Sequence, residues 1–374
     1  MKQLEYNVRF NTPAFLGNAE QNAQWRTPPF KALMRQWWRV AYAAANGFSA
    51  NVAAMRREEG WLFGVASDSE GDSRKSQIRI RLDRWDEGQL KKGQWQALAT
   101  VSHPELPRKI SSDLYLGYGP VTLRGATQPT LKANAAIQFG ESAMLSVAVP
   151  DTSADLVEHA LSLMHLYGTA GGRSRNGWGS FALPPLLASD EKGDVPVRPW
   201  REALALDWPH AIGQDEHGAL IWQTHSFDDW KGVMHELALI KIGLRTQFVF
   251  TTGKNADHPE ARHWLSHPVT NHNVAAWKEW GRGDFRLPNS LRFKVRKATD
   301  GKFVGVIFHV PCLPPLLFKP DLNAIQAVWQ NIHVLLDELT RPTTERTYRS
   351  VADVARRTRL KPSLDPLSLQ RISE

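Results

Sequence analysis

Apolar and polar residues alternate over several short segments of this chain, and such alternation predicts β-strands. In the first half these segments are residues 4–10, Gln77–Asp83 and Ala143–Val149. In the second half, Leu291–Lys297 and Phe303–Val310 flank the turn residues Thr299-Asp-Gly301, which predicts a β-hairpin. Short strands separated by turns are typical of mostly antiparallel sheets.

Apolar residues at helical spacing predict longer helices in both halves. The predicted helices cover Phe30–Ala45, a segment from about Asp151 to Tyr167, residues 227–241 and Asp321–Leu339. Ser226 is the expected cap of the third helix. Because strands and helices mix in each half, the sequence predicts an α+β protein with two tandem ferredoxin-like (RRM-like) domains. No internal sequence repeat is visible, so the tandem arrangement rests on element order alone.

A segment with four prolines and several charges, residues 184–200, is the predicted domain boundary. We expect an N-terminal domain over residues 1–190, a second domain over 200–340 and a basic C-terminal tail over 341–374. Residues 86–135 are rich in turn formers and fit no regular element. They are therefore interpreted as part of the helical and loop insertions in the ferredoxin-like units.

The most informative motif is the segment Gly168–Ser180, in which five of thirteen residues are glycine. Glycine lets a backbone take positive φ and approach a ligand closely, and arginine suits phosphate. The loop is therefore a candidate site for a polyanion. Its candidate contact residues are Gly171, Gly172, Arg173, Ser174, Arg175, Asn176 and Trp178. The alternative is a plain helix-to-strand turn, with Asn176-Gly177 supplying the positive φ.

The known nucleotide-binding motifs do not fit this loop. A Walker A motif requires a lysine directly after its last glycine, and the loop has none there. The dinucleotide fingerprint connects a strand to a helix, whereas this loop leaves a predicted helix. We therefore expect no nucleotide cofactor, and a longer phosphate chain remains as the ligand.

The predicted helix at Phe30–Ala45 carries a second basic feature. Lys31, Arg35 and Arg39 are spaced by four residues and therefore line one stripe of the helix. We expect this stripe, together with Arg26, to face a phosphate backbone, with Trp38 able to stack on a base. The alternative is a solvated charged face above a buried tryptophan.

Composition is compatible with a nucleic-acid partner. The formal net charge is +8, and the chain has fifteen tryptophans, a residue that stacks on bases but also fills cores. A single cysteine, Cys312, rules out an internal disulfide and fits a reducing compartment. The N-terminus lacks the apolar core of a signal peptide, and no apolar run is long enough to span a membrane. We expect a cytoplasmic protein with no membrane partner.

No set of catalytic or metal-binding residues stands out. His258, His263, His267 and His272 are close in sequence, but their spacing matches no standard metal motif, so no metal is expected. His165, just before the glycine-rich loop, is the candidate for acid–base chemistry on a ribose hydroxyl. The alternative is that it packs or bonds locally on its helix.

The glycine-rich loop, read as Gly171–Phe181, resembles the signature loop of the RAMP superfamily of CRISPR proteins. The segments Phe15–Gly17, Arg26–Lys31 and Leu33–Arg39 further resemble the opening of the first-subunit RAMP protein of the type III-B (Cmr) effector. That family typically has Gly-Gly where this chain has Gly17-Asn18, and Lys-Gly where it has Lys31-Ala32. The resemblance is clear over residues 8–182 and weaker over 208–310.

The resemblance implies two ferredoxin-like domains and a place at one end of a ribonucleoprotein filament. It also implies binding to the 3′ region of the guide RNA, help in capturing target RNA, contact with other RAMP subunits and the absence of a catalytic loop. We therefore expect a non-catalytic RNA-binding subunit acting in antiviral defence. One alternative is a metal-independent guide-processing endoribonuclease that uses His165. Another is a structural adaptor whose basic face contacts a protein.

Overall fold

A computed structural model of the chain describes residues 1–49, 51–66, 73–125, 127–184, 195–277, 286–287, 289–347 and 367–372. We call the described residues up to 184 the first half and those from 195 the second half. The protein is a mixed α/β structure with several small sheets, most of whose strand pairs are antiparallel. None of the helices in the described ranges has the length and apolar character needed to cross a membrane.

The first half has the element order β-α-β-β-α-β around one antiparallel sheet. The elements are β1 (Lys2–Phe10), α1 (Thr27–Ala45), β2 (Arg79–Leu82), β9 (Ser142–Val149), α4 (Ala154–Tyr167) and β10 (Phe181–Ala182). The strands lie in the order β10-β1-β9-β2. The alternating residues of β1 explain the arrangement, because its even-numbered residues from Leu4 to Phe10 are buried under the helices while the odd-numbered ones are exposed.

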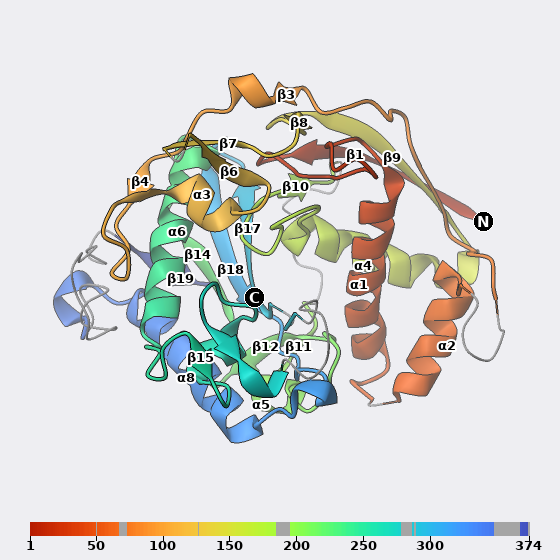
Figure 1. The fold of residues 1–374 in the computed structure, drawn as a ribbon. Coiled ribbons are helices and arrows are strands. Elements are labelled where there is room, and N and C mark those ends of the chain that lie inside the picture. Colours follow the sequence, from red (N-terminus) through yellow and green to blue (C-terminus); the bar gives the residue numbers. More distant parts are fainter. Residues whose placement is uncertain are drawn as a thin grey trace.

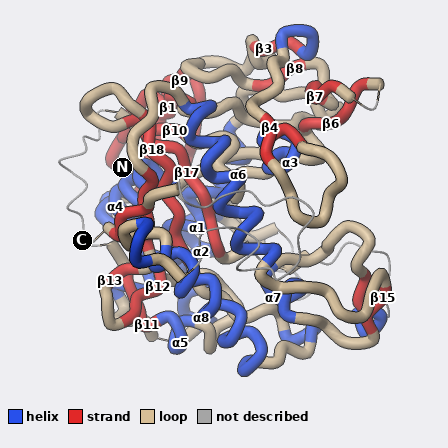
Figure 2. Tube along the Cα trace, turned by 90° about the vertical axis from the view of Figure 1, so that its left-hand side faces the viewer, coloured by secondary structure: helices blue, strands red, loops and turns tan. Residues whose placement is uncertain are grey.

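The second half repeats this order. The elements are β14 (Ile221–Thr224), α6 (Trp230–Thr246), β17 (Leu291–Lys297), β18 (Phe303–His309), α8 (Leu322–Glu338) and β19 (Leu369–Arg371). The strands lie in the order β17-β18-β14-β19, again antiparallel. Figure 2 shows α6 and α8 lying beside this sheet.

Shorter elements are inserted between these. In the first half they are α2 (Val52–Phe63), β3 (Leu90–Lys91), β4 (Thr100–Val101), β5 (Ile110–Ser111), α3 (Ser112–Gly117), β6 (Val121–Arg124), β7 (Gln128–Leu131) and β8 (Ala135–Ala136). In the second half they are β11 (Val197–Pro199), α5 (Trp200–Ala203), β12 (Ile212–Asp215), β13 (Gly218–Ala219), α7 (Ala261–Leu265), β15 (Asn255–Ala256) and β16 (Asn273–Val274). Figure 1 shows β3, β4, β6, β7, β8 and α3 together at one end of the molecule.

The two halves pack as alternating layers of helix and sheet. Every residue of β18 is buried, because both faces of its sheet are covered. On one face, the Phe308 ring packs against the first half, with its centroid 5.0 Å from that of Tyr167 in α4 and 6.2 Å from that of Trp37 in α1. On the other face, Ile307 joins the core formed with α6 and α8. The cores therefore do not divide cleanly at the predicted domain boundary.

Basic residues of β17 tie the halves together. Lys294 Nζ donates to the carbonyl of Met164 at 3.2 Å and also to that of His165, and Arg296 Nε donates to that of Leu166 at 2.8 Å. These carbonyls end α4, where cations are favourable. The second half thus caps the helix that leads into the glycine-rich loop.

Several expectations are confirmed and others are wrong. The hairpin of β17 and β18 is present, and Asp321 caps α8. The cap of α6 is Asp229, whose side chain accepts from Gly232 N at 2.8 Å, and not Ser226. Residues 348–366 and 185–194 lie outside the described residues. Within the predicted basic tail, Leu369–Arg371 form strand β19, which pairs with β14.

Candidate nucleic-acid interface

Helix α1 begins at Thr27, with prolines in its first turn where no backbone N–H is needed. Its apolar stripe is buried, including Trp37 and Trp38, which are 1% and 2% exposed. The Trp38 ring lies 4.9 Å from Tyr42 and 5.8 Å from Phe63. The prediction that Trp38 stacks on a base is therefore wrong, because its ring is enclosed in the core.

The basic stripe of α1 shares one carboxylate. Arg39 donates to both oxygens of Glu59, at 2.5 and 3.0 Å, and Arg35 Nη2 donates to Glu59 Oε2 at 3.1 Å. The Glu59 side chain, from α2, is 3% exposed, while the arginines are 41% and 29% exposed. Burial alone would raise the pKa of Glu59, but hydrogen bonds and charge from Arg35 and Arg39 outweigh it and lower the pKa. Two cations against one anion leave this stripe positive.

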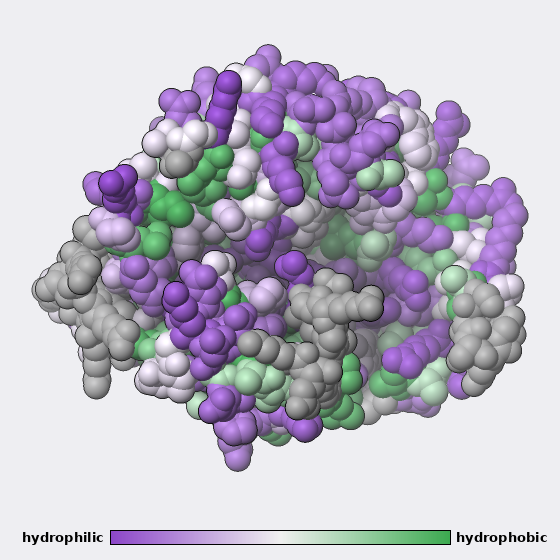
Figure 3. Space-filling model, in the orientation of Figure 1, coloured by the Kyte–Doolittle hydropathy of each residue, from purple (hydrophilic) through white to green (hydrophobic). Residues whose placement is uncertain are grey.

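This stripe borders an open groove. Lys31, Arg35, Gln36 and Arg39 line a hollow of about 580 Å³ together with Thr27, Pro28, Ala32 and Phe63. Partial burial and the neighbouring Arg35 lower the pKa of Lys31. Figure 3 shows this face of the molecule hollowed near its centre, with hydrophilic surface along the hollow. The guanidinium groups are thus accessible to a ligand in a groove.

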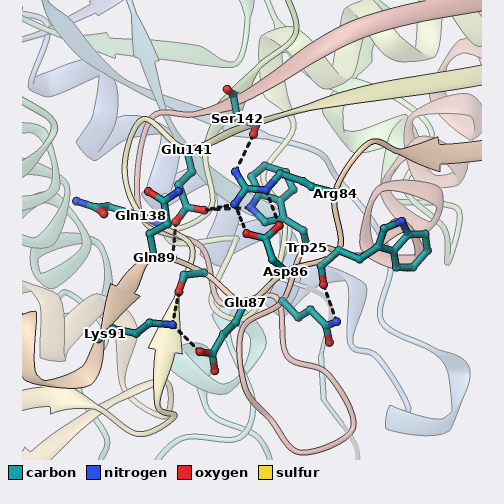
Figure 4. A network of polar contacts seen from close by, with 12 residues as sticks. Trp25, Arg84, Asp86, Glu87, Gln89, Lys91, Gln138, Glu141 and Ser142 are labelled. Carbon is teal, nitrogen blue, oxygen red and sulfur yellow. Dashed lines mark hydrogen bonds and ion pairs between the residues drawn. The ribbon is translucent and has the colours of Figure 1, made fainter.

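A polar network fixes the segment that leads into α1 (Figure 4). The buried carboxylate of Glu141 accepts from Trp25 Nε1 at 3.1 Å, from Gln89 N at 2.8 Å and from Gln138 N at 2.6 Å. Arg84 lies over the Trp25 ring, with its Cζ 5.5 Å from the ring centroid. This network explains the fixed position of Arg26, the residue before α1.

Arg26 itself donates from Nη1 to the carbonyl of Gly17 at 2.6 Å. Its side chain is partly exposed beside the turn formed by Gly17 to Ala23, where Asn18 N donates to Asn22 O at 2.8 Å. Arg26 therefore holds this turn through the carbonyl of Gly17. That it also belongs to the basic surface stays a prediction.

The glycine-rich loop is bound tightly into the protein. Gly172 N donates to Phe15 O at 2.9 Å, and Gly179 N donates to Pro13 O at 2.9 Å. In the opposite direction, Thr12 Oγ1 donates to Gly177 O at 2.8 Å. The expectation that the loop's glycine amides assist RNA binding is therefore wrong for Gly172 and Gly179, whose amides are used inside the protein.

Two glycines show why the loop needs this residue. Gly171 has a φ of +96°, and a Cβ there would lie 2.7 Å from the carbonyl oxygen of Phe15. Gly179 has a φ of +63°, and a Cβ there would lie 1.9 Å from the carbonyl oxygen of Ala170. Both positions combine a conformation that favours glycine with a close backbone approach. These glycines shape the loop itself.

Trp178 is fully buried, with 0% of its surface exposed. Its ring lies 5.3 Å from that of Phe15, 5.7 Å from that of Trp95 and 6.1 Å from that of Trp230. Trp230 belongs to α6, so this aromatic cluster joins the loop to the second half. Of the two roles open for Trp178, the structure favours core packing over stacking on RNA.

Asn176 is also buried and is used structurally. Its Nδ2 donates to Leu116 O at 2.6 Å, and its Oδ1 accepts from Lys241 Nζ. It is wrong to expect this side chain to contact RNA directly, because both of its ends are occupied. Its location nonetheless brings Lys241 of α6 next to the loop, a contact that the sequence did not reveal.

The remaining loop residues divide between surface and interior. Arg173 is exposed and has a φ of +56°, and Ser174 is partly exposed. Arg175 reaches inward, where its Nη2 donates to Gln36 Oε1 of α1 at 3.0 Å. Burial lowers the pKa of Arg175 to about 10. Because Gln36 also lines the α1 groove, Arg175 joins the loop to the basic stripe.

A second groove is lined by part of the loop. Its volume is about 780 Å³, and its walls include Gly171, Gly172 and Gly119, the charged residues Lys132 and Glu20, and the segments 15–17 and 21–23. Amide side chains of Gln21, Asn22 and Asn134 also face it. A groove of this size and polarity can hold a nucleotide-sized ligand. The loop therefore lines this groove directly through Gly171 and Gly172 and reaches the α1 groove through the hydrogen bond of Arg175 to Gln36.

His165 has a structural partner. Its Nδ1 accepts from Leu183 N at 2.9 Å, so the imidazole fixes the return of the chain after the loop. No group of three or more potential metal ligands occurs in the described ranges. The sequence analysis did not identify Glu59 or Glu141 as functional residues. A carboxylate at a position where helical or strand spacing predicts a buried side chain would have indicated them.

A match to a known protein family covers the part of the chain that contains α1 and the glycine-rich loop. Residues 7–182 match the RAMP superfamily, and this span contains α1 and the whole glycine-rich loop. The resemblance inferred from the loop and the helix is thereby confirmed for this part of the chain. No curated protein matches the sequence.

Two solved structures are similar in overall form. One is Cmr1 from Pyrococcus furiosus in its apo form, with 14% identity, a TM-score of 0.41, and coverage of 87% of this chain and 93% of that one. The other is a chain of the type III-B Cmr-beta complex bound to cognate target RNA, with 10% identity, a TM-score of 0.40, and coverage of 88% and 99%. Both TM-scores are low, and we transfer no residue role from either structure.

Proposed function

We propose that this chain is a non-catalytic RNA-binding subunit of a type III CRISPR ribonucleoprotein effector. In this proposal it acts in the cytoplasm, holds the 3′ region of the guide RNA and helps to capture target RNA alongside other RAMP subunits. The observation that carries the proposal is the α1 stripe: Lys31, Arg35 and Arg39 line an open groove next to a RAMP-type glycine-rich loop.

The architecture supports this function. The order β-α-β-β-α-β occurs in each half, and we interpret each half as a ferredoxin-like domain with insertions. In our proposal the RNA does not stack on Trp38 or Trp178. Its backbone follows the α1 groove past Gln36, and the groove beside Gly171 and Gly172 accommodates a neighbouring nucleotide.

Electrostatics favour a polyanion in the α1 groove. The stripe carries three cations, and among the described residues Glu59 is the only carboxylate that pairs with them. Contacts between such cations and phosphates are independent of base sequence and weaken as salt increases. This agrees with a subunit that holds guide RNAs of many sequences.

The non-catalytic part of the proposal rests on the local environment of His165, whose Nδ1 is occupied by Leu183 N. The experiment is incubation of the purified chain with repeat-containing RNA in EDTA, beside a His165→Ala variant. We expect binding without cleavage by both proteins. Site-specific cleavage that the His165→Ala variant lacks would instead identify an endoribonuclease.

Binding is tested with a variant in which both arginines of the stripe and their shared carboxylate are uncharged. Replacing the arginines alone would strand the buried Glu59, so the variant is Arg35→Gln/Arg39→Gln/Glu59→Gln, with Glu59→Gln as its control. We expect the triple variant to bind single-stranded RNA about tenfold more weakly than the control, because two charge-assisted contacts are lost. Equal affinities of these two proteins would contradict the proposal.

A further inference from the structure

Basic side chains from both halves meet around one small cavity beside the glycine-rich loop. Arg175 comes from the loop, and Lys241 and Arg245 come from one stripe of α6. The cavity has a volume of about 30 Å³, and its other walls are Leu244, Leu265, Ser266, Asn289, Leu291 and Phe293. This is room for roughly two or three waters or one phosphate-sized group.

Each of these cations contacts a neutral acceptor. Arg175 donates to Gln36 Oε1 at 3.0 Å, and Arg245 Nη1 donates to Ser266 Oγ at 2.8 Å. Lys241 donates to Asn176 Oδ1. In the parts of the chain that the structure describes, no carboxylate forms an ion pair with any of the three. The acidic group that acts on Arg245 is Glu105, which is already paired with Arg262 at 2.5 Å.

Holding these charges together is costly in the free protein. Burial lowers the pKa of Lys241 well below its usual range, and Arg245 and Arg173 lower it further. Burial likewise lowers the pKa of Arg245. Like charges that are packed without a counterion repel one another in a medium of low dielectric constant. An anion in the cavity would relieve both the repulsion and the loss of hydration.

We propose that Arg175, Lys241 and Arg245 form a receptor for one phosphate group at the junction of the two halves. Two guanidinium groups and one ammonium supply charged donors that suit phosphate oxygens. The three side chains are partly exposed, so a ligand can reach them. The inference rests on the proposed function in one respect, which is that RNA is the expected source of the phosphate.

The geometry connects this receptor to the α1 groove. Gln36 lines that groove and also accepts the hydrogen bond from Arg175. A strand that lies along Lys31, Arg35 and Arg39 therefore contacts Gln36, the hydrogen-bond partner of the receptor residue Arg175. Since Arg175 belongs to the first half and the other two cations to the second, a bound phosphate also bridges the halves and stabilises the folded chain.

The test measures thermal unfolding of the full chain with inorganic phosphate and with chloride at matched ionic strength. The variants are Lys241→Met and Arg245→Gln, and the control is Arg79→Gln/Arg81→Gln on the exposed face of β2. Phosphate at about twenty times its Kd is expected to raise the Tm of the wild type and the control by about 2 °C. Both receptor variants are expected to lose this phosphate-specific rise.

A rise that is equal in the wild type and both receptor variants would overturn the inference. If one variant does not fold, the other still provides the comparison, because each removes a different cation. RNA binding is measured in parallel. RNA binding that is unchanged in the receptor variants, together with an unchanged phosphate response, would refute the receptor and leave the proposed function standing. A receptor-dependent phosphate response without RNA binding by the wild type would refute only the proposed function.

The source of the phosphate is determined by adding saturating single-stranded RNA. If the RNA backbone occupies the receptor, RNA removes the phosphate-induced rise in Tm, and Lys241→Met weakens RNA binding about tenfold. If free phosphate is the ligand, its effect adds to that of RNA. Both results support the receptor and assign its ligand.

Discussion

The α1 stripe and the pair of cations on α6, Lys241 and Arg245, are both basic, but their charges are compensated differently. On α1, Arg35 and Arg39 share the buried carboxylate of Glu59 and keep their outer surfaces in an open groove. On α6, Lys241 and Arg245 donate instead to the neutral side-chain oxygens of Asn176 and Ser266. The difference teaches that sequence basicity alone does not define an RNA surface. A stripe whose arginines share a buried carboxylate is stable without a ligand, whereas a cluster of buried cations with no carboxylate partner gains stability when an anion binds.

The glycine-rich loop stands between these two regions and is mainly structural. Substitutions in the loop are therefore expected to affect stability most. Trp178→Ala should lower the free energy of unfolding by about 3–5 kcal/mol, because it leaves a cavity among Phe15, Trp95 and Trp230. Urea denaturation measures this change. The milder Trp178→Phe variant should cost less and keep the affinity for RNA of the wild type. A large loss of RNA affinity in a stably folded Trp178→Phe protein would show that Trp178 contributes to RNA binding.

Replacing Glu59, which pairs with the arginines of α1, should reduce stability less than Trp178→Ala does. It should not weaken RNA binding. Glu59→Gln should lower the free energy of unfolding by about 2 kcal/mol, because the amide carries no negative charge and its nitrogen cannot accept a hydrogen bond from Arg35 or Arg39. RNA affinity should stay the same or increase, because the stripe becomes more positive. Both quantities, the free energy of unfolding and the RNA affinity, are measured on the same preparation of Glu59→Gln and of the wild type. Weaker RNA binding by Glu59→Gln would show that the stripe needs its carboxylate in order to bind.

The two regions should also respond oppositely to pH. The pKa of Glu59 is lowered in the folded state, so its contribution is present above the unfolded pKa and is lost as the pH falls through the folded pKa. On α6, burial raises the pKa of Glu236 to about 8, so the folded state retains a proton that the unfolded state has lost. Stability from this group therefore falls as the pH rises from about 5 to 8.

Single variants separate these two contributions. Glu59→Gln should flatten the loss of stability on the acid side, and Glu236→Gln should flatten the decline between about pH 5 and 8. His225 lies 3.5 Å from Glu236, so His225→Gln is the control for a contribution from that imidazole. Unfolding measured across this pH range checks both expectations. An acid-side profile that is unchanged in Glu59→Gln, or a decline that persists in Glu236→Gln, would contradict the assignment concerned.

Much of the fold could be predicted from the sequence, because the pattern is local. Alternation located β1 and the β17–β18 hairpin, and helical spacing located α1, α4 and α8. The sequence misplaces the cap of α6 because Ser226 and Asp229 are both good caps. The backbone hydrogen bonds between Phe227 and Phe303 of β18 keep residue 227 out of the helix, so that Asp229 becomes the cap. Strand β19 was missed because a three-residue strand acquires its structure from the sheet that it joins.

The candidate site could be predicted only in part. The spacing of Lys31, Arg35 and Arg39 was enough to identify a stripe, and the resemblance of the loop was enough to indicate the RAMP superfamily. The sequence could not reveal that Trp178 and Asn176 face inward, since that depends on α6 from the other half. It also could not reveal that Lys241 and Arg245 approach Arg175, because these residues are far apart in the sequence and become neighbours only in the folded structure.

The central claim is that RNA phosphates bind along the α1 stripe, and its most direct test is the salt dependence of RNA binding. The variant Arg35→Gln/Arg39→Gln/Glu59→Gln is compared with Arg79→Gln/Arg81→Gln, which removes two exposed arginines from β2. The account predicts that the slope of log K against log salt for single-stranded RNA falls by about 1.4 in the α1 variant and stays unchanged in the β2 variant. An unchanged slope in the α1 variant, with a reduced slope in the β2 variant, would contradict the account.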